Sequence, residues 1–434
     1  MTRKYIFIIL IVMLVFGGAL YFMYQGGSTN TDTIDGTATK KTGLFSFFPF
    51  IGGGTQAPVV TPVASDEGFT EPQLPPVTQT GMEALKQLST RPIAGLTTLP
   101  ALDTSTTTSA VHSALGSTLT EEKLPRVRYV EQGTGTVYET TMSGSAENRL
   151  TSTVIARSAH AVFANKGESV AIRFIKNDNT TVGTFLGKIA SGTSTSVGTL
   201  EGSFLPDGIL DITASADGKS YAYIVGSESG AVGMTMRADG TGKKQLFQNL
   251  LSEWLLDWKA GGITTTSKAS SGIAGYAYLV SGTGVFQKII GPTPGLTTNL
   301  APSGKKLLYN TAGERTLRMA IRTIASGVDT PVELSTLPEK CTWNAKSTLI
   351  YCAVPQNLFN EHYPDTWYQG MISFTDALWK IDAVTGLTTR ITTGSEALID
   401  ATTLSLDSTE RFLVFINKND GTPWSLDLEK AVVR

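Results

Sequence analysis

Five ionisable side chains recur along the chain, each close to the start of a predicted strand. Such groups gathered around one opening would attract a cation or a basic partner, and carboxylates in a channel could also serve an enzyme. The alternative interpretation is that they are polar turn residues that point separately into water. The five residues are His160, Asp211, Glu253, Glu339 and Asp400.

An aromatic segment within residues 356–374 is the second candidate site. Aromatic side chains often anchor protein interfaces, and loops on rigid scaffolds are common places for binding. The alternative is a loop that folds over a channel or a blade and uses its aromatic side chains as local core. The candidate contact residues are Phe359, His362, Tyr363, Trp367 and Tyr368.

The two cysteines, Cys341 and Cys352, lie on either side of a predicted turn at Lys346 and Ser347. This spacing makes them cross-strand neighbours, and we expect a hydrogen-bonded pair with Cα atoms ~5.5 Å apart. A disulfide is allowed outside the cytoplasm. The sequence leaves their redox state open, and we expect a structural role rather than a catalytic one.

The composition argues against several classes of function. The chain has a net charge of −2 with scattered Lys and Arg, so no nucleic-acid footprint is present. Its three histidines and two cysteines lack the spacing of a zinc site. No nucleophile elbow and no Walker A loop occur in the sequence. We therefore expect a non-enzymatic protein with no catalytic residue, no cofactor and no metal.

A repeated unit must position these residues. Residues 214–225 read as a strand, an Asp-Gly turn of type I′ and a second strand. Similar units follow at 163–172 and 300–309, with looser copies at 258–263, 343–350 and 404–415. Three successive intervals between their turns are about 43 residues, which is typical of four-stranded propeller blades.

The closure of the ring follows from one missing strand and one spare strand. Residues 93–154 form a less regular first blade, and the last unit ends one strand short. Residues 85–90 resemble an outer strand, so we expect them to complete the last blade and close a seven-bladed all-β propeller at 85–434. A six-bladed ring with 85–155 as a separate part is the alternative. In either ring, the loops that lead into the inner strands lie on the same face of the propeller as the aromatic segment.

The N-terminal region predicts a membrane anchor. Residues 5–24 contain no charged side chain and are long enough to span a bilayer, with Arg3 and Lys4 on the cytoplasmic side. A cleaved signal peptide is the alternative. Residues 25–84 read as a flexible linker rich in Gly, Thr, Pro and Ser. Its apolar patch, residues 44–51, would contact the membrane, dock on a partner or pack on its own domain.

The repeat, apolar-x-Ser-x-Asp-Gly-Lys-x-x-apolar-x-Tyr, resembles the TolB-like and WD-repeat-like β-propellers of bacterial envelope proteins. The Trp-Asp dipeptide of true WD repeats is absent. An anchor, a linker and a propeller also resemble envelope proteins of small-genome bacteria. The resemblance implies a single-pass protein of the bacterial cytoplasmic membrane, with its N-terminus inside and its propeller outside.

The expected function is non-enzymatic binding of a protein or cell-wall component. Two alternatives stay open. One is a channel-site enzyme or cation-dependent glycan binder that uses the carboxylates of Asp211, Glu253, Glu339 and Asp400, and the other is a structural subunit of a secretion or pilus assembly. One fold carries many unrelated functions, so the repeat does not choose among them.

Overall fold

A computed structural model describes residues 84–102, 124–192, 196–313, 316–391 and 398–431. The predicted anchor, the linker with its apolar patch, and residues 103–123 of the predicted first blade lie outside the described residues. No helix within the described ranges is long and apolar enough to cross a membrane.

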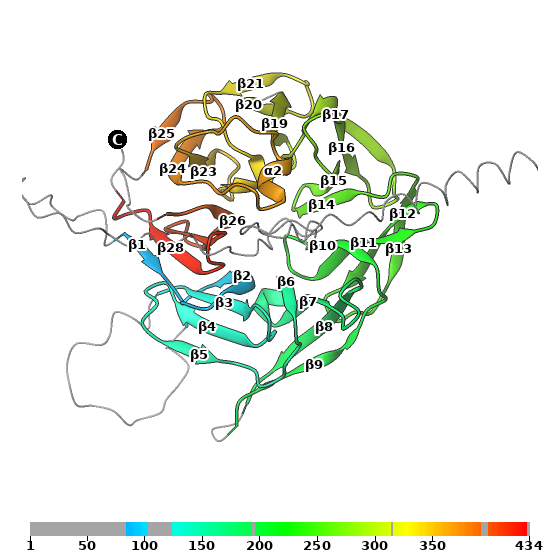
Figure 1. Ribbon diagram of the computed structural model, residues 1–434, viewed down its shortest axis with the longest axis vertical. Coiled ribbons are helices and arrows are strands. Elements are labelled where there is room, and N and C mark those ends of the chain that lie inside the picture. Colours follow the sequence, from blue (N-terminus) through cyan, green and yellow to red (C-terminus); the bar gives the residue numbers. More distant parts are fainter. Residues whose placement is uncertain (1–83, 103–123, 193–195, 314–315, 392–397, 432–434) are drawn as a thin grey trace, which may run out of the picture. The chain divides into compact units, whose positions relative to one another are not determined.

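Seven four-stranded antiparallel sheets form within the described residues, and Figure 1 shows them radiating from a common centre. We number them as blades one to seven, and the inner strand of each blade comes first in the lists below. Blades one to four contain β2 (Ile93–Leu99), β3 (Arg126–Glu131), β4 (Val137–Thr141) and β5 (Glu147–Arg149); β6 (Ser158–Ala164), β7 (Ser169–Ile175), β8 (Val182–Ala190) and β9 (Thr199–Phe204); β10 (Ile209–Ala214), β11 (Ser220–Ser227), β12 (Gly230–Arg237) and β13 (Lys244–Asn249); and β14 (Trp254–Lys259), β15 (Gly262–Ser267), β16 (Ala274–Val280) and β17 (Phe286–Pro294).

Blades five to seven complete the ring. They contain β18 (Thr298–Leu300), β19 (Lys306–Gly313), β20 (Thr316–Thr323) and β21 (Asp329–Val332); β22 (Cys341–Trp343), β23 (Leu349–Pro355), β24 (Asp376–Asp382) and β25 (Thr388–Arg390); and β26 (Ala401–Leu406), β27 (Phe412–Asn417), β28 (Pro423–Asp427) and β1 (Leu85–Gln87). Three short helices lie between strands: η3 (Asn165–Gly167), η4 (Pro338–Lys340) and α2 (Asp365–Tyr368).

The N-terminal strand closes the last blade, as predicted. Strand β1 pairs with β28 in the register Leu85 with Leu426 and Lys86 with Ser425. The seven-bladed ring is therefore confirmed, and the six-bladed alternative is wrong because β2–β5 form a blade of their own. Pairing with β28 covers a sheet edge that would otherwise be open.

The Asp-Gly hairpin between β10 and β11 differs from the expected two-residue turn. The Ser215 amide donates the closing hydrogen bond to the Ser220 carbonyl oxygen, and only Gly218 in this turn has positive φ, at 68°. Asp217 accepts hydrogen bonds from the Ser215 hydroxyl and the Lys219 amide, which favours the wider loop. The turn is thus four residues wide, and a type I′ turn was the wrong expectation.

Apolar side chains fill the spaces between adjacent blades. Ile172 of β7 and Val130 of β3 share one cluster, and Leu308 of β19 shares another with Ile350 of β23. This pattern follows from strand alternation, because both faces of each sheet meet a neighbouring sheet. The inner strands are thereby held around a central channel.

Candidate functional site

A cavity of about 320 Å³ occupies one mouth of the central channel. Side chains from all seven blades line it, and it opens on the face formed by the loops that enter the inner strands. We call this face the insertion face, because the loop between β23 and β24 lies on it. The ionisable residues in the lining are His160, Arg173, Asp211, Asp257, Lys268, Glu339, Tyr368 and Lys418.

Only part of the predicted ionisable ring meets at this mouth. His160 on β6, Asp211 on β10 and Glu339 in η4 line the cavity. Glu253 lies before β14, in a neighbouring groove, where Lys268 contacts it at 3.5 Å. Asp400 is fully buried behind the channel wall. The carboxylates therefore do not converge on one point.

Asp211 joins blade three to blade four. Its Oδ2 atom accepts a hydrogen bond of 2.7 Å from the Leu256 amide on the next inner strand. Burial raises its pKa to about 6, although this hydrogen bond and the positive charge of Arg173 act in the opposite direction. Asp257 repeats the arrangement one blade on, because its Oδ2 accepts the Leu300 amide at 3.2 Å. Each of these aspartates links its blade to the next through a hydrogen bond from an inner strand, and we call such a link a clasp.

His160 lies beside Arg173 in the register of β6 and β7. Burial, together with the charge of Arg173, lowers the pKa of His160 to about 3. The imidazole is therefore neutral at physiological pH, and its Nδ1 atom has no hydrogen-bond partner in the described part of the chain. Arg173 donates to the carbonyl oxygens of Ile209 and Leu210 at 2.9 Å, which ties blade two to blade three.

Glu339 and Tyr368 form a hydrogen-bonded pair at the cavity wall. The Tyr368 hydroxyl donates to Glu339 Oε1 at 2.6 Å. Burial raises the pKa of Glu339 to about 7, against this hydrogen bond and the positive charges of Lys340 and Lys418. The pair holds the end of α2 against η4, so the insertion forms part of the channel wall.

The aromatic segment is mostly buried. Tyr363 and Trp367 are fully buried, and Tyr368 lines the channel. They pack with Phe374 over η4, and the Trp367 and Phe374 rings stack with centroids 5.9 Å apart. Of the five predicted contact residues, Phe359 is 51% exposed and His362 is exposed. The alternative of a local core describes Tyr363 and Trp367, which are buried, and Tyr368, which is half-buried.

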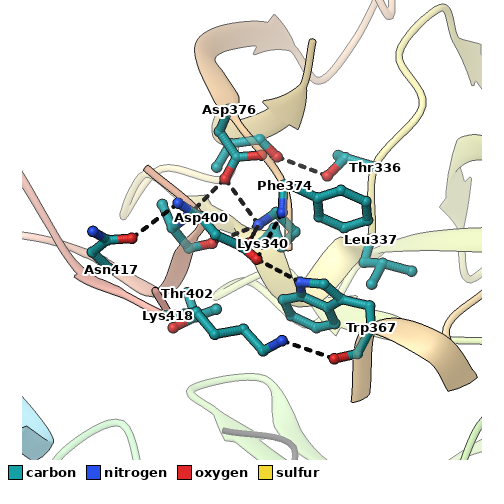
Figure 2. A network of polar contacts seen from close by, with 12 residues as sticks. Thr336, Leu337, Lys340, Trp367, Phe374, Asp376, Asp400, Thr402, Asn417 and Lys418 are labelled. Atoms are coloured by element: carbon teal, nitrogen blue, oxygen red, sulfur yellow. Dashed lines mark hydrogen bonds and ion pairs between the residues drawn. The ribbon is translucent and has the colours of Figure 1, made fainter. Parts of the chain in front are cut away.

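A buried polar network fixes this insertion in place (Figure 2). Lys340 Nζ lies between Asp400 Oδ1 at 2.5 Å and Asp376 Oδ2 at 2.9 Å, and all three side chains are inaccessible to solvent. Burial lowers the pKa of the ammonium, but the two carboxylates outweigh it and raise that pKa. Asp400 Oδ2 also accepts the Trp367 indole N–H at 2.8 Å, and it accepts the Phe374 amide at 3.0 Å.

Lys340, Asp376 and Arg173 carried no signal that set them apart in the sequence. Lys340 ends the short helix η4 next to Glu339, and Asp376 begins β24. Arg173 lies inside an apolar strand. Lys418 was also missed, although it donates to the Trp367 carbonyl at 2.8 Å. Only long-range packing brings these charges together.

Cys341 and Cys352 form a disulfide between β22 and β23. Their Cα atoms are 4.1 Å apart, which is the shorter spacing of a non-hydrogen-bonded pair. The predicted pairing is present, but the expected 5.5 Å spacing is wrong. Both residues are buried, so the bond lies within the wall between blades five and six.

The described residues contain no group of three or more His, Cys, Asp or Glu side chains that could hold a metal ion. The channel mouth instead combines charged groups of both signs with an apolar collar. That collar includes Ile93, Leu255 and Ile416. Such a lining suits a ligand or peptide with both polar and apolar groups.

Comparison with family models and with curated proteins finds no match. Solved structures similar to this chain include TolB from Acinetobacter baumannii, at 13% identity and a TM-score of 0.40, with 71% of this chain and 65% of TolB covered. A protein from Lactobacillus plantarum matches at 14% identity with a TM-score of 0.45, and the match covers 69% of this chain and 90% of that protein. Oligogalacturonate lyase from Vibrio parahaemolyticus matches at 9% identity with a TM-score of 0.42, and the match covers 77% of this chain and 96% of the lyase. A TolB protein is thus among the solved structures that this chain resembles.

Proposed function

We propose that this chain is a membrane-anchored, extracytoplasmic binding module without enzymatic activity, and that the insertion face binds a protein or cell-wall component. The observation that carries the proposal is the arrangement of this face. The channel cavity and a groove of about 730 Å³ adjoin there, because Arg173, Leu210 and Lys268 line both. Rigid loops around such a continuous hollow favour binding.

The carboxylates near the channel are bonded to structural partners, which supports a binding function over a catalytic one. Asp211 accepts a backbone amide, Glu339 accepts the Tyr368 hydroxyl, and Asp400 pairs with Lys340. Catalytic acids and bases must reach the reacting atoms of one substrate, and these three carboxylates are directed to separate structural partners. The raised pKa values of Asp211 and Glu339 follow from burial at these structural positions.

The exposed apolar residues of the insertion supply the contact residues for a partner. Phe359 is half exposed and Met371 is 69% exposed, and both lie in the loop between β23 and β24. The buried Tyr363 and Trp367 would support this loop from beneath rather than touch a partner. The anchor at residues 5–24 would hold the propeller at the membrane, with its N-terminus in the cytoplasm.

Capture of partners with the full chain tests this proposal. The bait is extracted from the membrane fraction in detergent, and the variant F359S/M371S is compared with V384S/L387S, whose changes lie on the opposite face. We expect recovery of a specific partner to fall about tenfold with F359S/M371S, the equivalent of ~1.4 kcal/mol, and to be unchanged with V384S/L387S.

Equal recovery with both variants would contradict the proposed face. Recovery of the bait from the soluble fraction would contradict the anchor. Co-purification of a set of assembly components in fixed ratio, insensitive to F359S/M371S, would favour the structural subunit of a secretion or pilus assembly instead.

A further inference from the structure

The 730 Å³ groove lies across blades two to four on the insertion face. Its walls are the loop between β7 and β8, the loop between β11 and β12, and the segments that enter β10 and β14. We propose that this groove is the docking site of the chain's own apolar patch, residues 44–51. We call it the blade-three groove below.

The blade-three groove carries apolar surface that is open to water. Leu210 is exposed and lies over Gly226, where an added Cβ atom would lie 3.5 Å from Leu210 Cδ1. Leu250, at 87% exposure, and Leu251 border the lining residues Ser252 and Glu253. Adjacent exposed leucines of this kind mark a surface that another apolar segment covers.

The floor of the groove is fixed by close backbone packing. Gly230 has a φ of 125°, and a side chain there would meet the Asn249 carbonyl oxygen at 2.1 Å and the Leu250 backbone at 2.7 Å. The amide of Gly226 also donates to the Gly208 carbonyl at 3.1 Å. A rigid floor loses little conformational entropy when a segment binds.

The patch Leu44-Phe-Ser-Phe-Phe-Pro-Phe-Ile51 suits this surface. It holds four phenylalanines, and no charged residue occurs between residues 42 and 65. About 33 residues separate Ile51 from β1. Extended at ~3.4 Å each, they reach ~110 Å, whereas a domain of this size has a radius of gyration of ~20 Å. The patch can therefore reach any part of the propeller.

The charged groups that line the groove balance. Glu228 and Glu253 supply two exposed carboxylates, and Arg173 and Lys268 supply two positive charges. A segment without charge, such as residues 44–51, therefore suits this lining. Docking would cover part of the insertion face, so a partner that binds there would compete with the patch.

The test measures the accessibility of a groove cysteine in the full chain. Ser252→Cys places a thiol in the groove, and Ser326→Cys places a matched thiol on the opposite face. The two native cysteines are bonded to each other. Each reporter is labelled with a maleimide in lipid nanodiscs, with the native patch and with F45S/F47S/F48S/F50S.

We expect the changed patch to speed the labelling of Ser252→Cys about tenfold, because a site covered nine-tenths of the time is open in about one-tenth of molecules. Labelling of Ser326→Cys should not change.

Equal labelling of Ser252→Cys with both patches would overturn the proposal. Protection that disappears on dilution would assign the groove to a second copy of the chain. Protection in detergent but not in nanodiscs would assign the patch to the membrane. Either result also overturns intramolecular docking, and neither bears on the partner-binding test above.

Discussion

At the scale of single residues, Lys340 explains why Asp400 is not a channel group. A lysine without access to water is tolerated only where carboxylates and carbonyl oxygens surround it. Lys340 Nζ meets both Asp376 and Asp400, and it donates to the Ala401 carbonyl at 3.0 Å. Its ammonium also lies 5.0 Å from the centre of the Trp367 ring. The site therefore stabilises the insertion rather than binding a ligand.

Glu339 gives a prediction about pH. Its folded-state pKa is raised to about 7, so its contribution to stability is complete below pH 4.5 and is lost as the pH rises through 7. The variant E339Q keeps an acceptor for Tyr368 but cannot ionise. In the native chain, ionisation of Glu339 should lower the free energy of unfolding by on the order of 2 kcal/mol between pH 5 and pH 8. We expect this decrease to be absent in E339Q.

Denaturant unfolding at the two pH values measures this difference. The variant E201Q, at an exposed position on β9, serves as the control and should follow the native pH dependence. An E339Q curve parallel to the native one would show that Glu339 titrates as an ordinary exposed carboxyl group.

At the scale of elements, the inner strands are joined by side chains that bond to the next blade. Asp211 and Asp257 accept amides, whereas the Asn299 side-chain amide donates to the Cys341 carbonyl at 2.7 Å. Each clasp satisfies a polar group at the edge of an inner strand, where burial without a partner is costly. Of the five ionisable residues read from the sequence, Asp211 belongs to this set of clasps.

Two substitutions at Asp211 test the role of its hydrogen bond to the next blade. D211A leaves the Leu256 amide without its acceptor, and we expect a loss of ~1–3 kcal/mol in the free energy of unfolding. D211N keeps an oxygen in the same place and should lose less than half as much. Equal losses in the two variants would mean that charge or packing, and not the hydrogen bond to the next blade, sets the role of this residue.

At the scale of the whole molecule, the sequence was sufficient to predict the ring. Strand-turn-strand units at regular spacing predicted blades of four strands, and the unpaired last unit predicted the closing strand β1. These features depend on local pattern and on the need to cover sheet edges, and both can be read along the chain.

The candidate site was less predictable because burial depends on contacts distant in sequence. Trp367 looked like a surface anchor, but Asp400 and Phe374 provide it with a polar partner and a stacking ring. Asp400 looked like a channel acid, but Lys340 pairs with it from a helix 60 residues earlier. Neither partner stands at a spacing that a sequence pattern detects.

The face assignments all depend on closure of the ring by β1, and a cross-link between its two ends measures closure most directly. Lys86 lies opposite Ser425, whereas Leu426 is one residue out of register and its side chain points to the other face of the sheet. Under mild oxidation, K86C/S425C should give a disulfide-linked peptide containing both positions, and K86C/L426C should not. Absence of the link in K86C/S425C, or equal linkage in both variants, would contradict the closed seven-bladed ring.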